Sequence, residues 1–387
     1  MPSRLRIVLA GGLGALPFAG VGWQVLHHLE GLRRLGHRVL YLEDTGRWPY
    51  DPDADSLCSD ARPAVRYLGA LMRRGGFEGT WAYRDAAGGR LYGIGERALA
   101  RELRAADVLI NLSGITVLGD ALRRIPARVY LETDPVLPQL EVATGRRFTI
   151  ELLASHTHHF TYGANFGAPD CRVPIQRFTY RPTLPPVILD WWRAPARPRG
   201  QRPFTTVGNW RQREKDFVWE GRRLRWSKHT EFLRIVELPR LTRVPIELAL
   251  AHAPSDPGIA RLAAAGWRIR SARPLSKDPE AYRSYIRASA GELSVAKEQN
   301  VVLRSGWFSD RTATYLAAGR PAVVQDTAFD AALPTGRGLL AFRGQAHAAA
   351  ALAQVVADYR VHCAAAAEIA REYLRAETVL GRMIESL

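Results

Sequence analysis

A segment near the carboxyl end, residues 304–327, combines residue types suited to binding a phosphate. It reads RSGWFSDRTATYLAAGRPAVVQDT. Small residues in its loop let backbone N–H groups approach an anion closely, and they are Ser305, Gly306 and Ser309. Asp310 is a candidate N-cap of a short helix, and Arg311 in the first turn would give a phosphate a forked, charge-assisted contact. The spacing predicts an anion site at a helix N-terminus, with an ordinary loop–helix–strand unit as the alternative.

The residues of this segment also carry a family resemblance. Arg311, Ala317, Gly319 and Pro321 match a motif of GT-B glycosyltransferases, and the segment most closely resembles bacterial family-one-like members, including spore-maturation-type glycosyltransferases. Those proteins place a ribose-binding Glu where this chain has Thr314. The resemblance implies an α/β protein of GT-B architecture, with two Rossmann-like parallel-sheet domains facing across a cleft. It further implies transfer of a sugar from a nucleoside diphosphate sugar to an acceptor hydroxyl or amine, with no cofactor and no essential metal.

The resemblance assigns further residues to the donor. Lys228 opens an expected helix downstream of the strand at residues 204–207, and a cation there would stabilise a leaving diphosphate, although a solvated basic face is the alternative. Glu292 and Lys297 would reach the sugar or the phosphate, or would pair with each other. The diphosphate-binding residues are expected to be Gly208, Asn209, Lys228, Ser305, Gly306, Phe308, Ser309, Asp310, Arg311 and Thr312. The sugar or ribose contacts are expected to be Glu292, Lys297 and Thr314.

Two residues are candidates for the catalytic base that deprotonates an acceptor. Asp134 follows an apolar strand at residues 128–131, and the carboxyl ends of parallel strands point into the ligand-binding edge of α/β domains. The alternative is that Asp134 only forms the turn before Pro135. His158, or its neighbour His156, is the second candidate. Adjacent and alternating histidines on a strand cannot all meet one metal ion, so we expect no metal site there.

The amino end predicts a βαβ unit, with strands at residues 5–10 and 38–42 and a helix at 21–35. Gly12 and Gly14 follow the first strand, but Pro17 stands where a dinucleotide-binding loop needs its third glycine. The acidic residues after the second strand also lie too far along the chain for that motif. In GT-B enzymes this loop often faces the cleft, so Gly12 and Gly14 are expected there. The acidic cluster at residues 51–55 lacks the glycine and glutamate of a calcium loop and is expected to be a solvated loop.

Composition limits the partners and the compartment. The 387 residues suffice for two domains, and the net charge of +16 invites a nucleic-acid or membrane-surface interpretation. The arginines are spread along the chain without long runs, so we expect no nucleic acid, while peripheral contact with anionic membranes stays open. Three widely spaced cysteines indicate a reducing compartment and thus a cytoplasmic protein. Glycines within the first 20 residues favour a strand and loop over a signal peptide.

The expected domain boundaries follow from changes in amino-acid composition along the chain. We expect an acceptor-side domain at residues 1–185, a proline-rich linker at 186–203, a donor domain at 204–345, and C-terminal helices at 346–387 that return to the first domain. Trp191 and Trp192 in the linker are expected to pack against a domain. Two other functions remain open: an epimerase of the same fold, acting on a nucleotide sugar without an acceptor, and a non-catalytic basic protein that binds nucleotides or nucleic acid.

Overall fold

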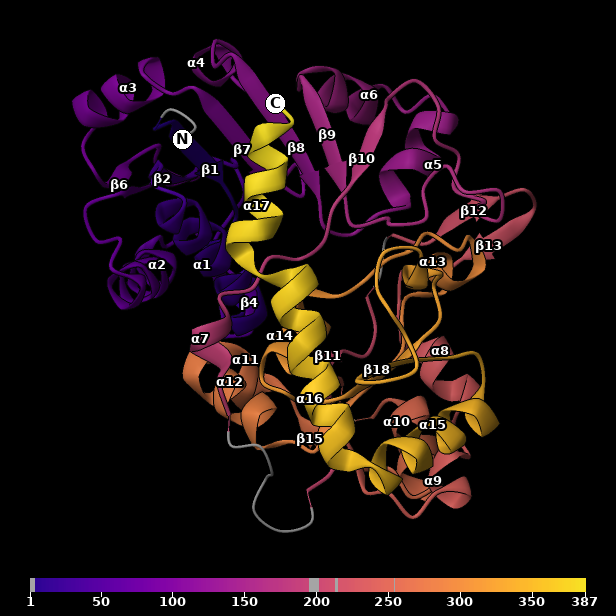
Figure 1. The fold of residues 1–387 in the computed structure, drawn as a ribbon. Coiled ribbons are helices and arrows are strands. Elements are labelled where there is room, and N and C mark those ends of the chain that lie inside the picture. Colours follow the sequence, from indigo (N-terminus) through magenta and orange to yellow (C-terminus); the bar gives the residue numbers. More distant parts are fainter. Residues whose placement is uncertain (1–3, 195–201, 213–214, 254) are drawn as a thin grey trace.

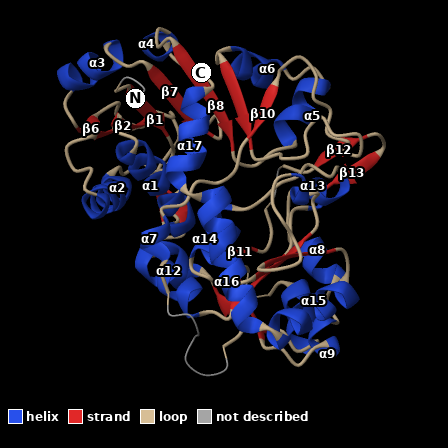
Figure 2. Cartoon of the chain, viewed as in Figure 1, coloured by secondary structure: helices blue, strands red, loops and turns tan. Residues whose placement is uncertain are grey.

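The structure is a computed structural model that describes residues 4–194, 202–212, 215–253 and 255–387. It has two lobes, each built on a mostly parallel sheet with helices on its faces (Figure 1). Figure 2 shows the strands of the two sheets in separate lobes, with helices around them. The residues 195–201 of the expected linker lie outside the described residues.

The N-terminal sheet has eight strands in the order β10-β9-β8-β7-β1-β2-β5-β6. All neighbours are parallel except the pair β5–β6. Its strands are β1 (Arg6–Ala10), β2 (Arg38–Glu43), β5 (Trp81–Arg84), β6 (Leu91–Gly93), β7 (Val108–Leu112), β8 (Ala127–Glu132), β9 (His158–Thr161) and β10 (Tyr180–Pro182). Its helices are α1 (Ala19–Arg34), α2 (Arg62–Gly75), α3 (Glu96–Arg104), α4 (Asp120–Arg123), α5 (Leu137–Ala143) and α6 (Arg147–Ala154), with a small hairpin of β3 (Tyr50–Asp51) and β4 (Ser56–Leu57). The central strand β7 is buried along its whole length, as its unbroken apolar pattern requires of a strand covered on both faces.

The C-terminal sheet has six parallel strands in the order β15-β14-β11-β16-β17-β18. This is the doubly wound Rossmann order, whose switch point lies between β11 and β16. Its strands are β11 (Phe204–Asn209), β14 (Ile246–Ala251), β15 (Arg268–Ser271), β16 (Gly291–Ser294), β17 (Ala322–Gln325) and β18 (Leu339–Phe342). Its helices are α8 (His229–Arg234), α9 (Leu238–Leu241), α10 (Pro257–Ala264), α11 (Arg273–Lys277), α12 (Pro279–Ala288), α13 (Glu298–Val302), α14 (Asp310–Ala317) and α15 (Gln345–Ala357), with a short 3₁₀ turn (Phe329–Ala331) and a hairpin of β12 (Phe217–Trp219) and β13 (Arg222–Leu224).

The chain crosses between the lobes twice, and the two crossings are bonded to each other. The Val187 N–H donates to the Leu374 carbonyl at 2.7 Å, and the Ala376 N–H donates to the Val187 carbonyl at 3.0 Å. The first crossing continues into α7 (Leu189–Trp192), where Trp192 is fully buried and donates its indole N–H to His27 of α1 at 3.0 Å. The two crossings therefore form one connection between the lobes.

The C-terminal helices, expected at residues 346–387, are interrupted in two places. α16 (Tyr359–Ile369) begins after a break at Asp358, and a π-helical turn (Ala370–Leu374) separates it from α17 (Ala376–Glu385). In Figure 1 the yellow helices run from the lower lobe to the upper one, and α17 lies against α1. The irregular turn falls at the second crossing, where the chain changes the lobe it covers.

Among the described residues, no helix combines the length and apolar character needed to cross a membrane.

Candidate functional site

A cavity of about 890 Å³ lies between the two lobes. Its C-terminal wall is formed by the carboxyl ends of β11, β14 and β15 and by the N-terminus of α14, and its N-terminal wall by α1 and residues around Tyr50. Open α/β sheets bind ligands outside the carboxyl ends of their strands, close to the switch point. The cavity therefore occupies the ligand position of the C-terminal Rossmann sheet.

Gly208 and Asn209, which the sequence predicted to bind the diphosphate, lie at the end of β11 and line this cavity. A Cβ built on Gly208 would have only the Arg311 guanidinium nearby, at 3.7 Å. The backbone of Gly208 thus faces open space, and a ligand can approach it closely.

Arg311 also lines the cavity, yet much of its guanidinium is bound within the protein. Its Nε donates to Glu292 Oε1 at 2.6 Å, and its terminal nitrogens donate to the Val207 carbonyl at 2.7 Å and to Ser294 Oγ at 2.6 Å. A guanidinium has five N–H donors, so two remain for a ligand. Burial opposes the charge, but the Glu292 carboxylate outweighs it and raises the pKa of Arg311.

Glu292 is therefore not placed as the sequence predicted. Its side chain is fully buried beneath Arg311 and does not line the cavity, so it holds the cation and not a sugar. Nor does it pair with Lys297, the alternative we had left open.

The N-cap of helix α14 lies one residue earlier than predicted. Ser309, and not Asp310, is the N-cap, and its hydroxyl accepts from the Arg311 N–H at 3.2 Å. Asp310 is the first helical residue and accepts from the Gln24 amide of α1 at 3.0 Å, which links the two lobes across the cavity. Burial raises the pKa of Asp310 to about 6. Sequence reasoning missed Gln24, because nothing local marks a glutamine on α1 as a partner of a distant helix.

Thr314 replaces the family's ribose-binding glutamate and lines the same cavity. Its hydroxyl donates to the Arg311 carbonyl of its own helix at 2.7 Å. Thr312 is buried and lines a small adjoining pocket together with Ser309 and Arg311. Phe308 also lines that small pocket, but its ring packs on Phe329 at 5.8 Å between ring centroids, so it supports the loop from the core.

A second group of charged residues lies at the junction between the two lobes. Asp134 of the N-terminal lobe forms an ion pair with Lys297 of the C-terminal lobe. The Lys297 ammonium lies 3.4 Å from the ring centroid of Trp226, and burial lowers its pKa to about 8 although Asp134 acts in the opposite direction. Lys228 lies at the start of α8 beside Trp307, 5.2 Å from its ring centroid. Burial, then the neighbouring Arg311 and Lys297 charges, lower the pKa of Lys228 strongly.

The loop that carries Asp134 is held in an unusual conformation. Val136 has φ 95° although it is β-branched, and its N–H donates to Gln139 Oε1 at 2.7 Å. Backbone outliers of this kind cost of order 1–3 kcal/mol and persist where the surroundings hold them. The second oxygen of Asp134 is buried without a hydrogen-bond partner among the described residues. The backbone outlier and the unpaired buried oxygen both lower stability at the place where this carboxylate meets the other lobe.

Ser305 and Gly306 do not expose their amides, so this part of the predicted anion cradle is wrong. Their N–H groups donate to the carbonyls of Asn300 at 3.2 Å and Thr327 at 2.6 Å, and the Ser305 carbonyl accepts from the Asn165 N–H at 3.2 Å. Gly306 has φ 79°, and a Cβ there would lie 2.2 Å from the Asn165 nitrogen. These residues join the lobes through the backbone, and that close approach explains the glycine.

The glycine loop of the N-terminal lobe does not line the cavity either. The Gly14 N–H donates to both oxygens of Glu43 at 2.8 and 3.0 Å, and the Ala15 N–H donates to Oε1 at 3.2 Å. A Cβ on Gly12 would collide with Ile115 at 2.2 Å. An internal carboxylate therefore binds the amides of the loop that was expected to face the cleft. Burial raises the pKa of Glu43 to about 7.

The histidines are also misplaced as catalytic bases. His158 is the first residue of β9, at the amino end of the strand, and its ring nitrogen contacts Thr157 Oγ1 at 2.9 Å. Parallel strands present ligand sites at their other end, so His158 faces away from the cavity. His156 is buried between the Leu152 carbonyl at 2.8 Å and the Asn111 amide at 3.1 Å, which is a structural role.

The acidic loop at residues 51–55 is more than a solvated loop. Asp53 pairs with Lys277 at 2.7 Å and Asp55 pairs with Arg273 at 3.0 Å, and both cations belong to α11 of the other lobe. Asp55, Arg273 and Lys277 line the interlobe cavity. Among the described residues, no group of three or more His, Cys, Asp or Glu side chains is arranged to hold a metal ion.

Comparison with known proteins identifies the fold. The sequence matches no protein-family model and no curated protein significantly. HepE from Anabaena, solved in complex with UDP and glucose, aligns over 99% of both chains with a TM-score of 0.58 and 12% identity. An alpha-glucosyltransferase in complex with UDP-glucose and DNA containing an abasic site aligns over 99% of both chains, with a TM-score of 0.59 and 9% identity.

AviGT4, a glycosyltransferase involved in avilamycin A biosynthesis, aligns over 99% of this chain and 97% of its own, with a TM-score of 0.55 and 13% identity. At such low identities the similarity establishes the GT-B fold, with its two Rossmann-like domains, and the activity has to be argued from the site. The narrower resemblance to spore-maturation-type enzymes stays a prediction.

Proposed function

We propose that this protein transfers a sugar from a nucleoside diphosphate sugar to an acceptor hydroxyl or amine, without an essential metal ion. The carrying observation is the interlobe cavity, where Gly208, Arg311 and the N-terminus of α14 meet at the carboxyl edge of the second Rossmann sheet. A helix N-terminus and a guanidinium both favour a diphosphate. Solved proteins of the same fold bind UDP or UDP-glucose, which makes UDP the first nucleotide to test.

The charges support a division of labour along the junction. The nucleoside would lie in the 890 Å³ cavity, and the diphosphate would lie against Ser309 and Arg311, which line both that cavity and the small pocket beside it. The sugar would then point towards Lys228 and the Asp134–Lys297 pair. Lys297, and Lys228 when it is protonated, would stabilise the negative charge that grows on the leaving diphosphate, which is the task a metal ion performs in other enzymes.

The direct test is nucleotide binding to the full chain with EDTA present. UDP, TDP, GDP and ADP would each be added in a thermal-shift series, and at least one should raise Tm, because a ligand at 100 times its Kd stabilises by about 2.7 kcal/mol. Inorganic pyrophosphate is the control for simple charge binding. If none of the four nucleotides shifts Tm, the proposal is wrong.

Asp134 remains the candidate acceptor-side base, because it is the carboxylate that the N-terminal lobe extends towards the donor-side cations. Asp134→Asn should lower kcat at least tenfold while donor KM stays within twofold. An equal change in Asp134→Asn and Lys297→Met, with both acting on KM alone, would show that the pair only joins the lobes. Product analysis with donor alone separates a transferase from an epimerase of the same fold.

A further inference from the structure

A second cavity lies at the opposite edge of the N-terminal sheet. It has a volume of about 360 Å³ and is lined by the starts of β1 and β2, the end of α1, the turn before β5, and α3. The interlobe cavity lies at the carboxyl ends of parallel strands, whereas this one lies at their amino ends. Strands rise about 3.3 Å per residue, so the length of the sheet separates the two.

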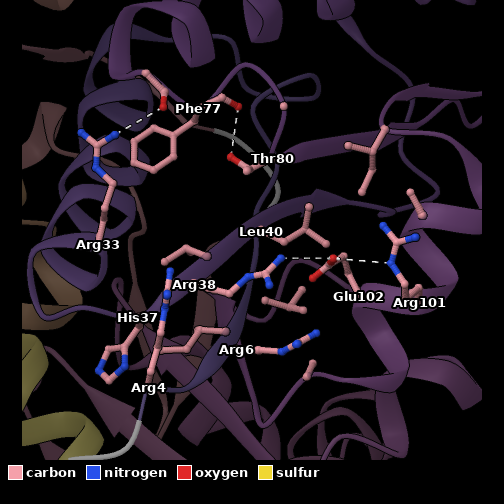
Figure 3. A pocket seen from close by; sticks show the side chains of 18 residues that line it. Arg4, Arg6, Arg33, His37, Arg38, Leu40, Phe77, Thr80, Arg101 and Glu102 are labelled. Atoms are coloured by element: carbon pink, nitrogen blue, oxygen red, sulfur yellow. Dashed lines mark hydrogen bonds and ion pairs between the residues drawn. The ribbon is translucent and has the colours of Figure 1, made fainter.

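Arginines dominate the lining of this second cavity (Figure 3). They are Arg4, Arg6, Arg33, Arg38 and Arg101, and the carboxylate among the lining residues is Glu102. Five cations thus face one anion across a concave surface. Like charges held together in a recess repel each other more than on an open surface, because less water screens them.

The internal partners of these arginines are incomplete. Arg38 and Arg101 share one oxygen of Glu102 at 3.5 and 4.0 Å, which is longer than a direct hydrogen bond. Arg6 uses its backbone N–H, at 2.7 Å, to hold the nearby Asp107 carboxylate, and its guanidinium has no ion pair among the described residues. The Arg4 side chain likewise has no ion pair in the part of the chain that the structure describes.

Arg33 is the exception and forms one wall. It pairs with Glu30, donates to the Gly76 carbonyl at 3.3 Å, and stacks over Phe77 at 4.6 Å from the ring centroid. Figure 3 shows Arg6, Arg38 and Arg101 on the other side, with Arg38 and Arg101 reaching Glu102 from opposite directions. Apolar side chains of Leu40 and Ile94 complete the lining.

We propose that this cavity binds a small phosphorylated anion carrying two or more phosphate charges, separately from the nucleotide-sugar cleft. Guanidinium groups match phosphate oxygens in a forked geometry. The volume lies within the range of small-molecule sites, and the apolar side chains suit an organic group attached to the phosphates. A bound polyanion would neutralise Arg4 and Arg6, which form no ion pair with any other residue that the structure describes.

The experiment is calorimetric titration of the full chain with inorganic tripolyphosphate, run in parallel on wild type and on Gly208→Val, in which the nucleotide cleft is altered. Wild type should bind about one tripolyphosphate. Arg6→Gln/Arg38→Gln should weaken binding at least tenfold, whereas Arg62→Gln/Arg147→Gln, which removes two exposed arginines of the same domain, should leave Kd within twofold.

A gain-of-function variant guards against misfolding as an explanation. Glu102→Gln removes the one competing carboxylate of the lining, so it should tighten tripolyphosphate binding about three- to tenfold. Gly208→Val in the cleft should leave it unchanged. The proposal is overturned if tripolyphosphate binding survives Arg6→Gln/Arg38→Gln, if it is lost in Gly208→Val, or if only duplex DNA and no small polyanion depends on these arginines.

Discussion

The first strand of each sheet ends in a glycine-containing loop, and the two loops are used in opposite ways. After β1, the Gly14 and Ala15 amides are bound to the Glu43 carboxylate at 2.8 to 3.2 Å. After β11, Gly208 borders the interlobe cavity and the Arg311 guanidinium lies beside it. The first loop already holds an anion of the protein itself, and the second is positive and open.

This difference arises outside the loops. Glu43 is the last residue of β2, the neighbouring strand, while Arg311 comes from α14 at the other side of the switch point. Glycine at the end of a Rossmann strand therefore permits close approach, but the charge supplied by a neighbouring element decides whether a ligand or the protein makes that approach. The following predictions test whether the contrast holds.

Removal of the Arg311 charge should have the largest effect. Arg311→Met leaves Glu292 buried without its partner, and breaking a buried pair costs about 3–5 kcal/mol. Urea denaturation should show this loss, and UDP binding should disappear with it.

A double variant separates the two effects of Arg311→Met. Arg311→Met/Glu292→Met replaces both charges by apolar groups and should recover most of the stability. Nucleotide binding should not recover. Recovered binding would mean that Arg311 supports only the fold.

Glu43 should matter for stability and not for nucleotide binding. Glu43→Ala leaves the Gly14 and Ala15 amides and the Tyr41 hydroxyl without their acceptor, and should cost about 3 kcal/mol in urea denaturation. The Kd for nucleotide should stay within threefold of wild type. A large change in Kd would show that the β1 loop contacts the ligand after all.

The same carboxyl should impose a pH dependence. The folded-state pKa of Glu43 is raised to about 7, so the native protein binds this proton more tightly than the unfolded chain does. The free energy of unfolding should therefore fall as pH rises from about 4.5 through about 7, by about 3 kcal/mol in all for this group. Glu43→Gln cannot ionise and should show a flatter profile.

Glu132 serves as the matched comparison for that profile. It is buried in the same lobe with its pKa also raised to about 7, so Glu132→Gln should flatten the profile in a similar way. Equal slopes in wild type and both variants would contradict the assignment.

The glycines themselves give the smallest and most direct contrast. Gly208→Val places its side chain in the cavity, so it should weaken nucleotide binding about tenfold, or about 1.4 kcal/mol, and change Tm by at most about 2 °C. Gly14→Val should lower Tm and leave nucleotide affinity unchanged, because its Cβ would lie 2.9 Å from Tyr83 and 3.0 Å from Ala64. Nucleotide affinity and Tm measured on both variants decide the matter.

Local pattern was sufficient for the elements near both loops. The strands predicted at residues 5–10 and 38–42 differ from β1 and β2 by one residue at one end. Apolar runs and turn residues specify such elements without help from the rest of the chain. Asp134 was likewise expected at the carboxyl end of its strand, and it lies two residues beyond the end of β8.

The partners of the charged side chains could not be predicted in the same way. Lys297 pairs with Asp134, 163 residues away. Glu292 of β16 pairs with Arg311 of α14 only because the fold packs that strand and that helix together. His158 is the first residue of β9, so it lies at the amino edge of the sheet, whereas parallel strands present their ligand sites at the carboxyl edge. Whether a polar side chain is free for a ligand depends on contacts between distant segments, and no local signal records them.

The bonded crossings between the lobes constrain how the cavity can open. Since the strand-like contact of Val187 with Leu374 and Ala376 fastens the outgoing and returning chain together, neither can bend alone. The lobes are thus joined by one doubled connection, which adds to the backbone bonds of Ser305 and Gly306 with the N-terminal lobe. If the cavity opens, the Asp53–Lys277 and Asp55–Arg273 pairs should part first, because they are among the most solvent-exposed of the ion pairs that join the lobes.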